Sequence, residues 1–454
     1  MQNLFDDLGS LDKRCYKDYG LSEDILMEHA ANGMNRYIRD NFAQASNVIV
    51  VAGGGNNGAD VIALARLLHV DYKVSIYYAK KPSSKMAILQ HKRVLKLGIK
   101  ECRKLESCEV LVDGLVGTGF QGELSSELHS LLKKMNSLKA HKIACDVPSA
   151  YKFLADVTIT MGALKKSMYL DAHKDYVGNI KVVDLGVSRD LYEKKSNWKL
   201  LDIDDLDLPN RNKDDSHKGS FGHLALALGE KSGAGIISAL SAFRFGTGLV
   251  TLVGFRDIEI PHSIMSSHIL PKSTSALALG MGLGDEFSKE KLSKFLNNKL
   301  PLVADADIFR NAQIFDILKR KNLVLTPHPK EFISLLKLTK LAKISVEELQ
   351  ANRFKYVEMF CKKFFHVTLL LKGTNVIIGK GEEFYINPHG SSVLAKGGSG
   401  DVLSGLVGAL LAQGYSPLEA TINASLSHTK LAQNYNGADF SLTPDDLIDG
   451  ICRL

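Results

Sequence analysis

The sequence predicts an α/β protein with two domains. Its 454 residues exceed what one hydrophobic core usually spans. Continuous apolar runs of strand length recur along the chain, and most end in a glycine-rich turn or an acid before a helical pattern. A polar stretch over residues 189–215 separates two such series. We therefore place the boundary near residue 195, between domains 1–195 and 196–454.

The composition is that of a globular protein, with 45% hydrophobic and 24% charged residues. The net charge of +7 is scattered and forms no basic stripe, so we expect no nucleic-acid partner. Six cysteines without a CxxC pair are typical of reduced thiols and disfavour structural zinc. No apolar run reaches membrane-spanning length and the start lacks a secretory signal, so we expect a cytoplasmic protein that does not bind membranes.

The first domain begins with helical patterns over residues 11–40, broken at Gly20. A buried strand over residues 47–52 then enters a glycine-rich turn at 53–60. A helix and a second strand over 73–79 follow, so the pattern predicts a βαβ unit.

The turn after the first strand matches the GxGxxG pattern of dinucleotide-binding domains at Gly53, Gly55 and Gly58. In dehydrogenases that bind NAD, an acid at the end of the second strand contacts the ribose. Here that strand ends in Ala79-Lys80-Lys81. The sequence therefore disfavours an ordinary NAD-dehydrogenase site. The two asparagines in the turn suit a hard cation or a ribose phosphate.

Polar side chains follow further strands of the first domain. Because the carboxyl ends of parallel strands lie along one edge of a sheet, these side chains should converge. Each one alone is more often a cap or turn residue, but the set indicates a site. Lys165, just beyond the strand at 156–161, is a candidate proton donor to a carboxylate. The converging residues are Asn57, Asp60, Asp113, Asp146 and Ser149.

The second domain repeats the α/β pattern. Predicted strands near 224–229, 249–253, 276–279, 302–304, 322–325 and 368–371 end in glycines, acids, His328 or Lys372. His328 alone is equally typical of a turn histidine. Its place at the edge shared with Lys372 and Asp401 favours a ligand contact.

The second domain also contains a glycine-rich loop that runs into the apolar helix pattern 402–411. Gly397, Gly398 and Gly400 around Ser399 let backbone N–H groups face one concavity at a helix start, which suits phosphate. We expect Asp401 to stay ionised there and to accept a proton from a substrate hydroxyl. The alternative is an Asp that only caps the helix.

Taken together, the ordered motifs resemble the family of bifunctional NAD(P)H-hydrate repair enzymes over nearly the whole chain. In that family an N-terminal epimerase domain precedes an ADP- or ATP-dependent dehydratase domain of the ribokinase-like superfamily. The resemblance therefore implies a Rossmann-like three-layer αβα domain followed by a ribokinase-like α/β domain. It rests on residues 26–28, 55–60, 113–119, 146–149, 217–219, 246–250, 280–284, 305–307, 326–332, 372–374 and 398–401.

For the first domain, the resemblance implies epimerisation of the R and S hydrates of NADH and NADPH. Asp146 with Lys165 would handle protons. Potassium would be bound by Asn57, Asp113 and Ser149. The hydrated nucleotide would be bound by Asn56, Asn57, Gly58, Ala59, Asp60, Gly117, Thr118, Gly119, Phe120, Gln121, Gly122, Glu123 and Asp146.

For the second domain, the resemblance implies dehydration of the S hydrate at the expense of ADP or ATP with Mg²⁺. Asp401 would activate the ring hydroxyl, and Gly282, Gly284, His328 and Asp401 would contact the hydrate. The adenine nucleotide would be bound by Lys372, Gly373, Thr374, Asn375, Gly398, Ser399 and Gly400. A homo-oligomer is also expected.

The chain departs from the family pattern at a few positions. Ala59 and Val61 replace two glycines of the first loop, and Ala150 replaces a glycine after Pro-Ser. Leu164 and Met281 each replace a proline. Side chains at the glycine positions would matter if a positive φ or a close ligand approach were needed there.

Two alternatives stay open at this point. The second domain also fits a ribokinase-like kinase for a small vitamin precursor such as a hydroxymethylpyrimidine, which would release a stable phosphorylated product. The first domain also fits a non-catalytic nucleotide-binding module, which would bind without epimerising.

Overall fold

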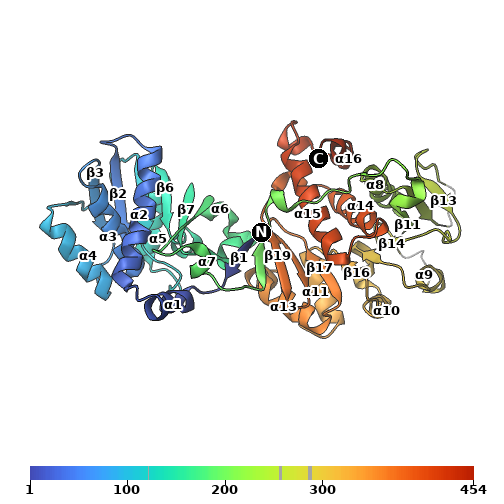
Figure 1. Cartoon of the computed structure of the whole chain (residues 1–454), viewed down its shortest axis with the longest axis horizontal. Coiled ribbons are helices and arrows are strands. Elements are labelled where there is room, and N and C mark those ends of the chain that lie inside the picture. Colours follow the sequence, from blue (N-terminus) through green and yellow to red (C-terminus); the bar gives the residue numbers. More distant parts are fainter. Residues whose placement is uncertain (121, 255–257, 285–288) are drawn as a thin grey trace. The chain divides into compact units, whose positions relative to one another are not determined.

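A computed structural model describes residues 1–120, 122–254, 258–284 and 289–454. The chain divides into two compact units, Gln2–Ser196 and Asn197–Leu454, and Met1 is grouped with the second unit. Figure 1 shows both units and their elements. No helix among the described residues is both long and apolar enough to cross a membrane.

The first unit is built on a seven-stranded sheet in which every neighbouring pair is parallel. From its third strand β2 (Asn47–Ala52) the chain continues first to β3 on one side and then, for the later strands, to β5 on the other side, so the strand order reverses at β2. That switch point is where ligands bind in open α/β sheets. In sheet order the strands are β4 (Lys100–Glu101), β3 (Lys73–Tyr78), β2, β5 (Val110–Gly114), β6 (His141–Cys145), β7 (Val157–Met161) and β9 (Asn179–Val183).

Helices cover both faces of this sheet, so the predicted three-layer αβα architecture is confirmed. Val48, Val50 and Val112 pack into the core that holds the buried faces of α2 and α3. The alternate residues Ile49 and Leu111 pack on the other face with α5. This alternation is the period of a strand buried on both sides. The helices are α1 (Gly9–Asp18), α2 (Glu23–Asn41), α3 (Asn56–Leu68), α4 (Lys85–Lys96), α5 (Ser126–Ser137), α6 (Lys174–Val177) and α7 (Arg189–Tyr192).

A short parallel pair, β1 (Gln2–Phe5) with β8 (Leu164–Lys165), also belongs to this unit. The predicted break between the first two helices is confirmed at Gly20, whose φ is +67°. Helix α2 then begins at Ser22, whose hydroxyl accepts the N–H of Ile25. Such a cap satisfies one of the free N–H groups at a helix start.

The second unit has a mixed sheet. The first seven strands of the sheet order given below, from β13 through β12 and β11 to β17, pair in parallel. The pairs β17–β18 and β18–β19 are antiparallel, and β10 lies parallel to β19. The predicted α/β class is confirmed, while the hairpin β18–β19 was not predicted. In sheet order the strands are β13 (Met265–Ser267), β12 (Leu249–Val253), β11 (His223–Ala227), β14 (Ala276–Leu279), β15 (Leu302–Ala304), β16 (Leu323–Leu325), β17 (Val367–Leu371), β18 (Val376–Lys380), β19 (Glu383–Asn387) and β10 (Trp198–Leu200).

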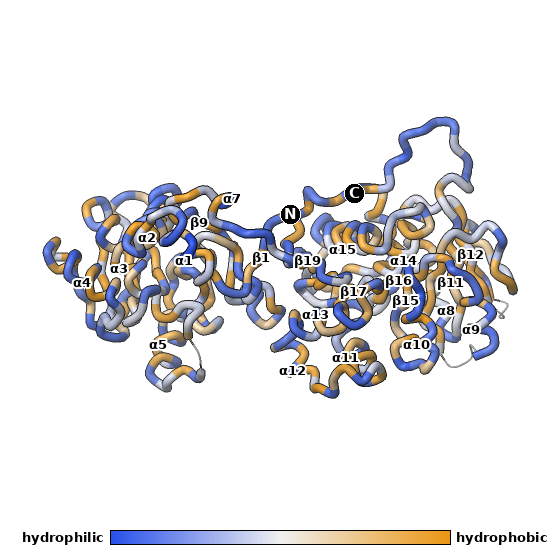
Figure 2. Tube along the Cα trace, turned by 60° about the horizontal axis from the view of Figure 1, so that its bottom comes forward, coloured by the Kyte–Doolittle hydropathy of each residue, from blue (hydrophilic) through white to orange (hydrophobic). Residues whose placement is uncertain are grey.

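Helix α14 (Ser399–Ala412) is the central helix of the second unit, and hydrophobic residues dominate it in Figure 2. Gly405 permits its close packing on α8, because a Cβ there would lie 2.3 Å from the Ser238 carbonyl oxygen. The Ser238 hydroxyl donates to the Asp401 carbonyl oxygen at 2.8 Å. These contacts fix the start of α14 against α8. The other helices are α8 (Ser232–Arg244), α9 (Lys289–Leu296), α10 (Ile314–Ile317), α11 (Pro329–Leu338), α12 (Val346–Ala351), α13 (Arg353–Lys363), α15 (Pro417–Gln433) and α16 (Pro444–Gly450).

The three residues that stand where the family pattern has glycine in the first unit differ in backbone conformation. Ala59 and Val61 lie inside α3, are fully buried and do not have positive φ. Val61 packs on Gly114, where an added Cβ would lie 2.5 Å from its Cγ2. Ala150 has φ 50° and ψ 21°, the left-handed conformation that favours glycine.

These backbone conformations predict opposite effects of two alanine-to-glycine substitutions. Ala150→Gly should raise the free energy of unfolding by up to about 1 kcal/mol, because relief of left-handed strain exceeds the entropy cost of glycine. Ala59→Gly should lower it by about 1 kcal/mol, because glycine is unfavourable inside a helix. Urea unfolding of the full chain should show the same transition moving in opposite directions. A loss of stability in both variants would contradict this interpretation.

Candidate active sites

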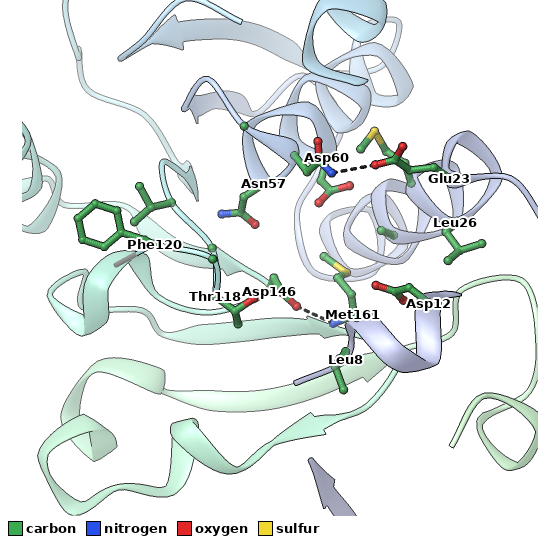
Figure 3. A pocket seen from close by; sticks show the side chains of 18 of the residues that line it. Leu8, Asp12, Glu23, Leu26, Asn57, Asp60, Thr118, Phe120, Asp146 and Met161 are labelled. Atoms are coloured by element: carbon green, nitrogen blue, oxygen red, sulfur yellow. Dashed lines mark hydrogen bonds between the residues drawn. The ribbon is translucent and has the colours of Figure 1, made fainter. Parts of the chain in front are cut away.

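A cavity of about 630 Å³ lies at the carboxyl edge of the seven-stranded sheet. Figure 3 shows side chains from α1, α2, α3, the loops after β5 and β6 and the end of β7 converging on it. The predicted residues that line it are Asn56, Asn57, Asp60, Gly117, Thr118, Gly119, Phe120, Asp146 and Lys165. Gly58, Ala59, Asp113, Gly122, Glu123 and Ser149 are not among its lining residues, and Gln121 lies outside the described residues.

An ion pair joins the two candidate proton-handling groups of this cavity. The Lys165 ammonium donates to Asp146 Oδ1 and, at 2.7 Å, to the Thr160 hydroxyl. The Lys165 side chain is only 3% exposed, whereas that of Asp146 is 16% exposed. A buried lysine that faces a carboxylate at the edge of a cavity provides a proton donor and acceptor at one place.

Asp146 also has a strained backbone. Its φ is 68°, and the N–H of Met161 donates to its Oδ1 at 3.2 Å (Figure 3). A non-glycine residue in the left-handed region costs about 1–2 kcal/mol. Such strain persists where surrounding contacts fix the residue, and it is concentrated at functional sites.

Asp113 and Ser149 form a hydrogen-bonded pair buried beside the cavity. The Ser149 hydroxyl donates to Asp113 Oδ1 at 2.6 Å, and the Ser149 N–H donates to Oδ2 at 2.8 Å. The N–H of Leu115 donates to Oδ1 at 3.1 Å. Burial nevertheless raises the pKa of Asp113 to about 6, although these three donors lower it. A positive charge beside Asp113 would favour its ionised form.

Asn57 lies in the first turn of α3 and approaches the loop after β5. A Cβ added to Gly117 would lie 3.4 Å from the Asn57 Cβ. The amide nitrogen of Asn57 is buried and has no hydrogen-bond partner within the described part of the chain. Because the oxygen and nitrogen of a side-chain amide exchange places by a flip, Asn57 can present either a donor or an oxygen ligand there.

Two glycines of the GxGxxG pattern are needed for close backbone packing at the turn. A Cβ at Gly53 would lie 1.9 Å from the Leu115 carbonyl oxygen, and one at Gly58 would lie 2.1 Å from the Gly53 carbonyl oxygen. Gly53 therefore allows the turn to approach the loop after β5, and Gly58 allows α3 to approach the turn. Gly58 is needed for this packing.

Several cavity residues were missed because they do not follow predicted strands. Asp12 lies on α1, and Tyr192 on α7 donates to its Oδ1 at 2.7 Å. Burial raises the pKa of Asp12 despite this hydrogen bond. Burial also raises the pKa of Asp60 well above its ordinary value. The cavity is also lined by Glu23, Lys80 and Ser83. In the sequence, Lys80 shows only that the acid typical of a dehydrogenase is absent from the end of the second strand.

The second candidate site lies at the carboxyl edge of the other sheet and centres on a buried carboxylate. Lys372, after β17, donates to both oxygens of Asp305, after β15, at 2.8 Å each. The Ser404 hydroxyl on α14 donates to Asp305 Oδ2 at 2.7 Å. Asp305 is 2% exposed and Lys372 is 22% exposed. The lysine therefore balances the buried charge and still reaches the surface of the site.

Asp401 lies in the first turn of α14, beside this ion pair. Burial, followed by repulsion from Asp305, raises its pKa to about 7, although Lys372 lowers it. The expectation that the helix start keeps Asp401 well ionised is therefore wrong, because burial outweighs the nearby amides. A carboxylate with a pKa near 7 is a stronger base than an ordinary aspartate and is partly available at neutral pH.

His328 lies in the same charged group but also caps α11. Its Nδ1 accepts the N–H groups of Lys330 at 3.1 Å and Glu331 at 3.3 Å. Its Nε2 lies 3.2 Å from Glu331 Oε1. Burial and Lys372 lower its pKa. His328 is therefore a neutral cap whose side chain is 43% exposed and accessible to a ligand.

The remaining predicted residues lie in the loops after β14 and β17 and at the start of α14. Gly282 and Gly284 have φ of +63° and +62°, and the Gly284 N–H donates to Asp307 Oδ2 at 3.0 Å. Gly398 has φ +89° at the start of α14, and a Cβ on Gly400 would lie 3.2 Å from Lys372 Nζ. Ser399 lies 3.1 Å from Nε2 of the buried His428, which was not predicted. Gly373, Thr374 and Asn375 form the turn between β17 and β18.

Family models match both units. Residues 224–453 match the family described as NAD(P)H-hydrate dehydratase, and residues 23–167 match the one described as YjeF-related protein N-terminus. A solved ADP/ATP-dependent NAD(P)H-hydrate dehydratase from Bacillus subtilis, co-crystallised with ATP/Mg²⁺, is 26% identical with a TM-score of 0.46. It covers 54% of this chain and 92% of that chain.

Curated relatives match over the full length. A bifunctional NAD(P)H-hydrate repair enzyme from Helicobacter pylori is 40% identical and covers 100% of both chains. One from Coxiella burnetii is 31% identical over 96% of this chain and 95% of its own.

The raised pKa of Asp401 predicts a pH-dependent gain in stability for Asp401→Asn. Below about pH 4 the carboxyl is protonated in both folded and unfolded chains, so the variant should match the native chain. Between about pH 4 and pH 7 the carboxyl is ionised in the unfolded chain but still protonated in the folded chain, so the native chain loses stability as pH rises and the variant should be more stable by at least about 2 kcal/mol near pH 7. Urea unfolding between pH 4 and 8 measures the difference. The exposed Asp214→Asn is the control, and a gain for Asp401→Asn that is independent of pH would contradict this interpretation.

Proposed function

Since the chain belongs to the family of bifunctional NAD(P)H-hydrate repair enzymes, we propose that its two units repair hydrated NADH and NADPH in two steps. Residues 1–195 epimerise the R and S hydrates, and residues 196–454 dehydrate the S hydrate at the expense of ADP or ATP. The observation that carries this assignment is that each sheet ends in its own carboxylate–lysine pair, Asp146–Lys165 and Asp305–Lys372.

In the first unit, Asp146 and Lys165 exchange protons with the hydrate. The ring nitrogen assists loss of the hydroxyl, which leaves as water after it takes a proton from Lys165. Water then adds to the opposite face of the ring and returns a proton to the pair. The turn at residues 56–60 and the loop at 117–120 hold the nucleotide, as supported by their place in the cavity wall.

The residues proposed to hold potassium fit an oxygen-liganded cation. The Asn57 amide nitrogen is buried and finds no partner among the residues that the structure describes, and Asp113 is a buried carboxylate whose pKa is raised to about 6. Ser149 adds a hydroxyl oxygen beside Asp113. When bound, potassium supplies a positive charge that favours ionised Asp113. Because the Ser149 hydroxyl also accepts the Val116 N–H at 3.0 Å, the same residues position the start of the 117–120 loop.

In the second unit, Asp401 accepts the proton of the ring hydroxyl as that oxygen attacks the terminal phosphate of the nucleotide. The nucleotide departs with one phosphate fewer, the bond between the ring carbon and the phosphorylated hydroxyl oxygen then breaks to release phosphate, and loss of a proton from the neighbouring carbon restores the double bond. Gly282, Gly284 and His328 contact the hydrate. Lys372, the turn 373–375 and the loop 398–400 bind the nucleotide. Mg²⁺, which accompanies the nucleotide, supplies positive charge to its phosphates.

The alternative is a ribokinase-like kinase with a non-catalytic first unit. It shares the use of Asp401 but gives no role to the Asp146–Lys165 pair in the first cavity. A stable phosphorylated product would support it. The homo-oligomeric state and the cytoplasmic location stay predictions.

Two substitutions should separate the activities. Asp146→Asn should slow epimerisation at least about 100-fold and leave dehydration of the S hydrate intact, because it removes the proton acceptor of one site only. Asp401→Asn should do the reverse. Chromatographic separation of the R and S hydrates and the absorbance of reduced nicotinamide measure the two rates. Loss of both activities in either variant would contradict two independent sites.

Potassium should stabilise the first unit in a pH-dependent way. Above pH 6, where Asp113 is ionised, replacing potassium by tetramethylammonium should lower the unfolding temperature and slow epimerisation. Below pH 6 the difference should fade, because Asp113 is protonated. Asp113→Asn should abolish the potassium response. Equal unfolding temperatures in the two salts at pH 8 would contradict the proposed potassium site.

A further inference from the structure

The loop after β3 is tied to the glycine turn of the first unit. The Gly54 carbonyl oxygen accepts the N–H groups of Ser83 at 2.9 Å and Ser84 at 3.0 Å. The Ser83 hydroxyl donates to the same oxygen at 2.9 Å. These bonds hold the backbone of the loop beside the turn. The Lys80 Cβ lies close to the turn, as a Cβ added to Gly54 would lie 3.7 Å from it. Lys80 and Ser83 both line the cavity.

The sheet order places Lys80 at the opposite end of the cavity edge from the proton-handling pair. Lys80 follows β3, on one side of β2, whereas Asp146 and Lys165 follow β6 and β7 on the other side. A dinucleotide bound at such an edge crosses the glycine turn with its adenosine ribose near the end of the second strand, here β3. If the reacting ring lies at Asp146, as the proposed function requires, the adenosine ribose lies at Lys80.

The charge at this end suits a phosphate better than a hydroxyl. An acid at the strand end would accept hydrogen bonds from both hydroxyls of an NADH ribose, but this position is occupied by Lys80. The Lys80 side chain is exposed, and no ion pair or hydrogen bond of its ammonium is found among the described residues. Its neighbour Lys81 does not line the cavity.

We propose that Lys80 is a specificity-determining residue that binds the 2′-phosphate of hydrated NADPH. The epimerase site then prefers the NADPH hydrate over the NADH hydrate. The inference rests on the proposed function of the first unit, and the preference comes from a charge-assisted hydrogen bond that NADH hydrate cannot form.

The test compares kcat/KM for epimerisation of the two hydrates in the full chain. In Lys80→Ala the ratio of NADPH-hydrate to NADH-hydrate kcat/KM should fall about tenfold or more, because one charge-assisted bond is lost. Lys80→Asp should lower the ratio further, because a carboxylate repels the phosphate. Lys81→Ala is the matched control and should leave the ratio unchanged. An unchanged ratio in Lys80→Ala, or an equal fall in Lys81→Ala, would overturn the inference.

A binding measurement separates this inference from the proposed function. Calorimetric titration of the full chain with NADP⁺ and NAD⁺ does not depend on epimerisation. A preference for NADP⁺ that Lys80→Ala removes and Lys81→Ala keeps would support phosphate recognition even if neither hydrate were epimerised, a result that would sink the proposed function alone. The same NADP⁺ preference in the native chain and Lys80→Ala would overturn the inference.

Discussion

A carboxylate that is buried or half-buried at the end of a parallel strand needs a charged or hydrogen-bonding partner, and this requirement determines the arrangement of both candidate sites. Burying an unpaired charge costs several kcal/mol, so each strand-end aspartate recruits specific donors. Asp146 is paired with Lys165, and Asp305 with Lys372 and Ser404. The partners come from other strands of the same unit, β8 for Asp146 and the end of β17 for Asp305, or from helix α14, so the fold itself assembles the charged groups.

The same requirement gives the two sites different chemistry. In the first unit the cavity contains a paired acid and base, suited to moving a proton to and from one ligand. In the second unit Lys372 forms an ion pair with Asp305. Asp401 lies beside this pair, and its burial raises its pKa to about 7. Asp401 is therefore poised to gain or lose a proton near neutrality, which is what activation of a hydroxyl needs.

The sequence was sufficient for the α/β class and for the groups at strand ends. Strand ends in a parallel sheet share one edge, so Asp146 and Lys372 could be found from local patterns alone, whereas the ion pair of Lys372 with Asp305 was not predicted. Asp12 and Tyr192 could not, because they come from helices that only tertiary packing brings to the cavity.

Burial also limited the sequence analysis. The protonation of Asp401 was predicted wrongly, because the extent of its burial is a property of the folded unit. The consequences of Ala59 and Ala150 likewise depended on backbone conformation, which is helical at one and left-handed at the other. Conversely, the sequence shows that Lys80 stands where an NAD dehydrogenase has an acid. Only the structure shows that Lys80 lines the cavity, which is the basis for its proposed contact with a phosphate.

The most direct test of two competent sites on one chain uses the pure R hydrate of NADPH with ATP or ADP, magnesium and potassium. In the proposed function the second unit dehydrates the S epimer and not the R epimer, so recovery from the R hydrate needs both units. The account predicts full return of the reduced-nicotinamide absorbance, faster than spontaneous epimerisation allows. Recovery from pure S but not from pure R beyond the spontaneous rate would contradict it and leave the first unit without epimerase activity.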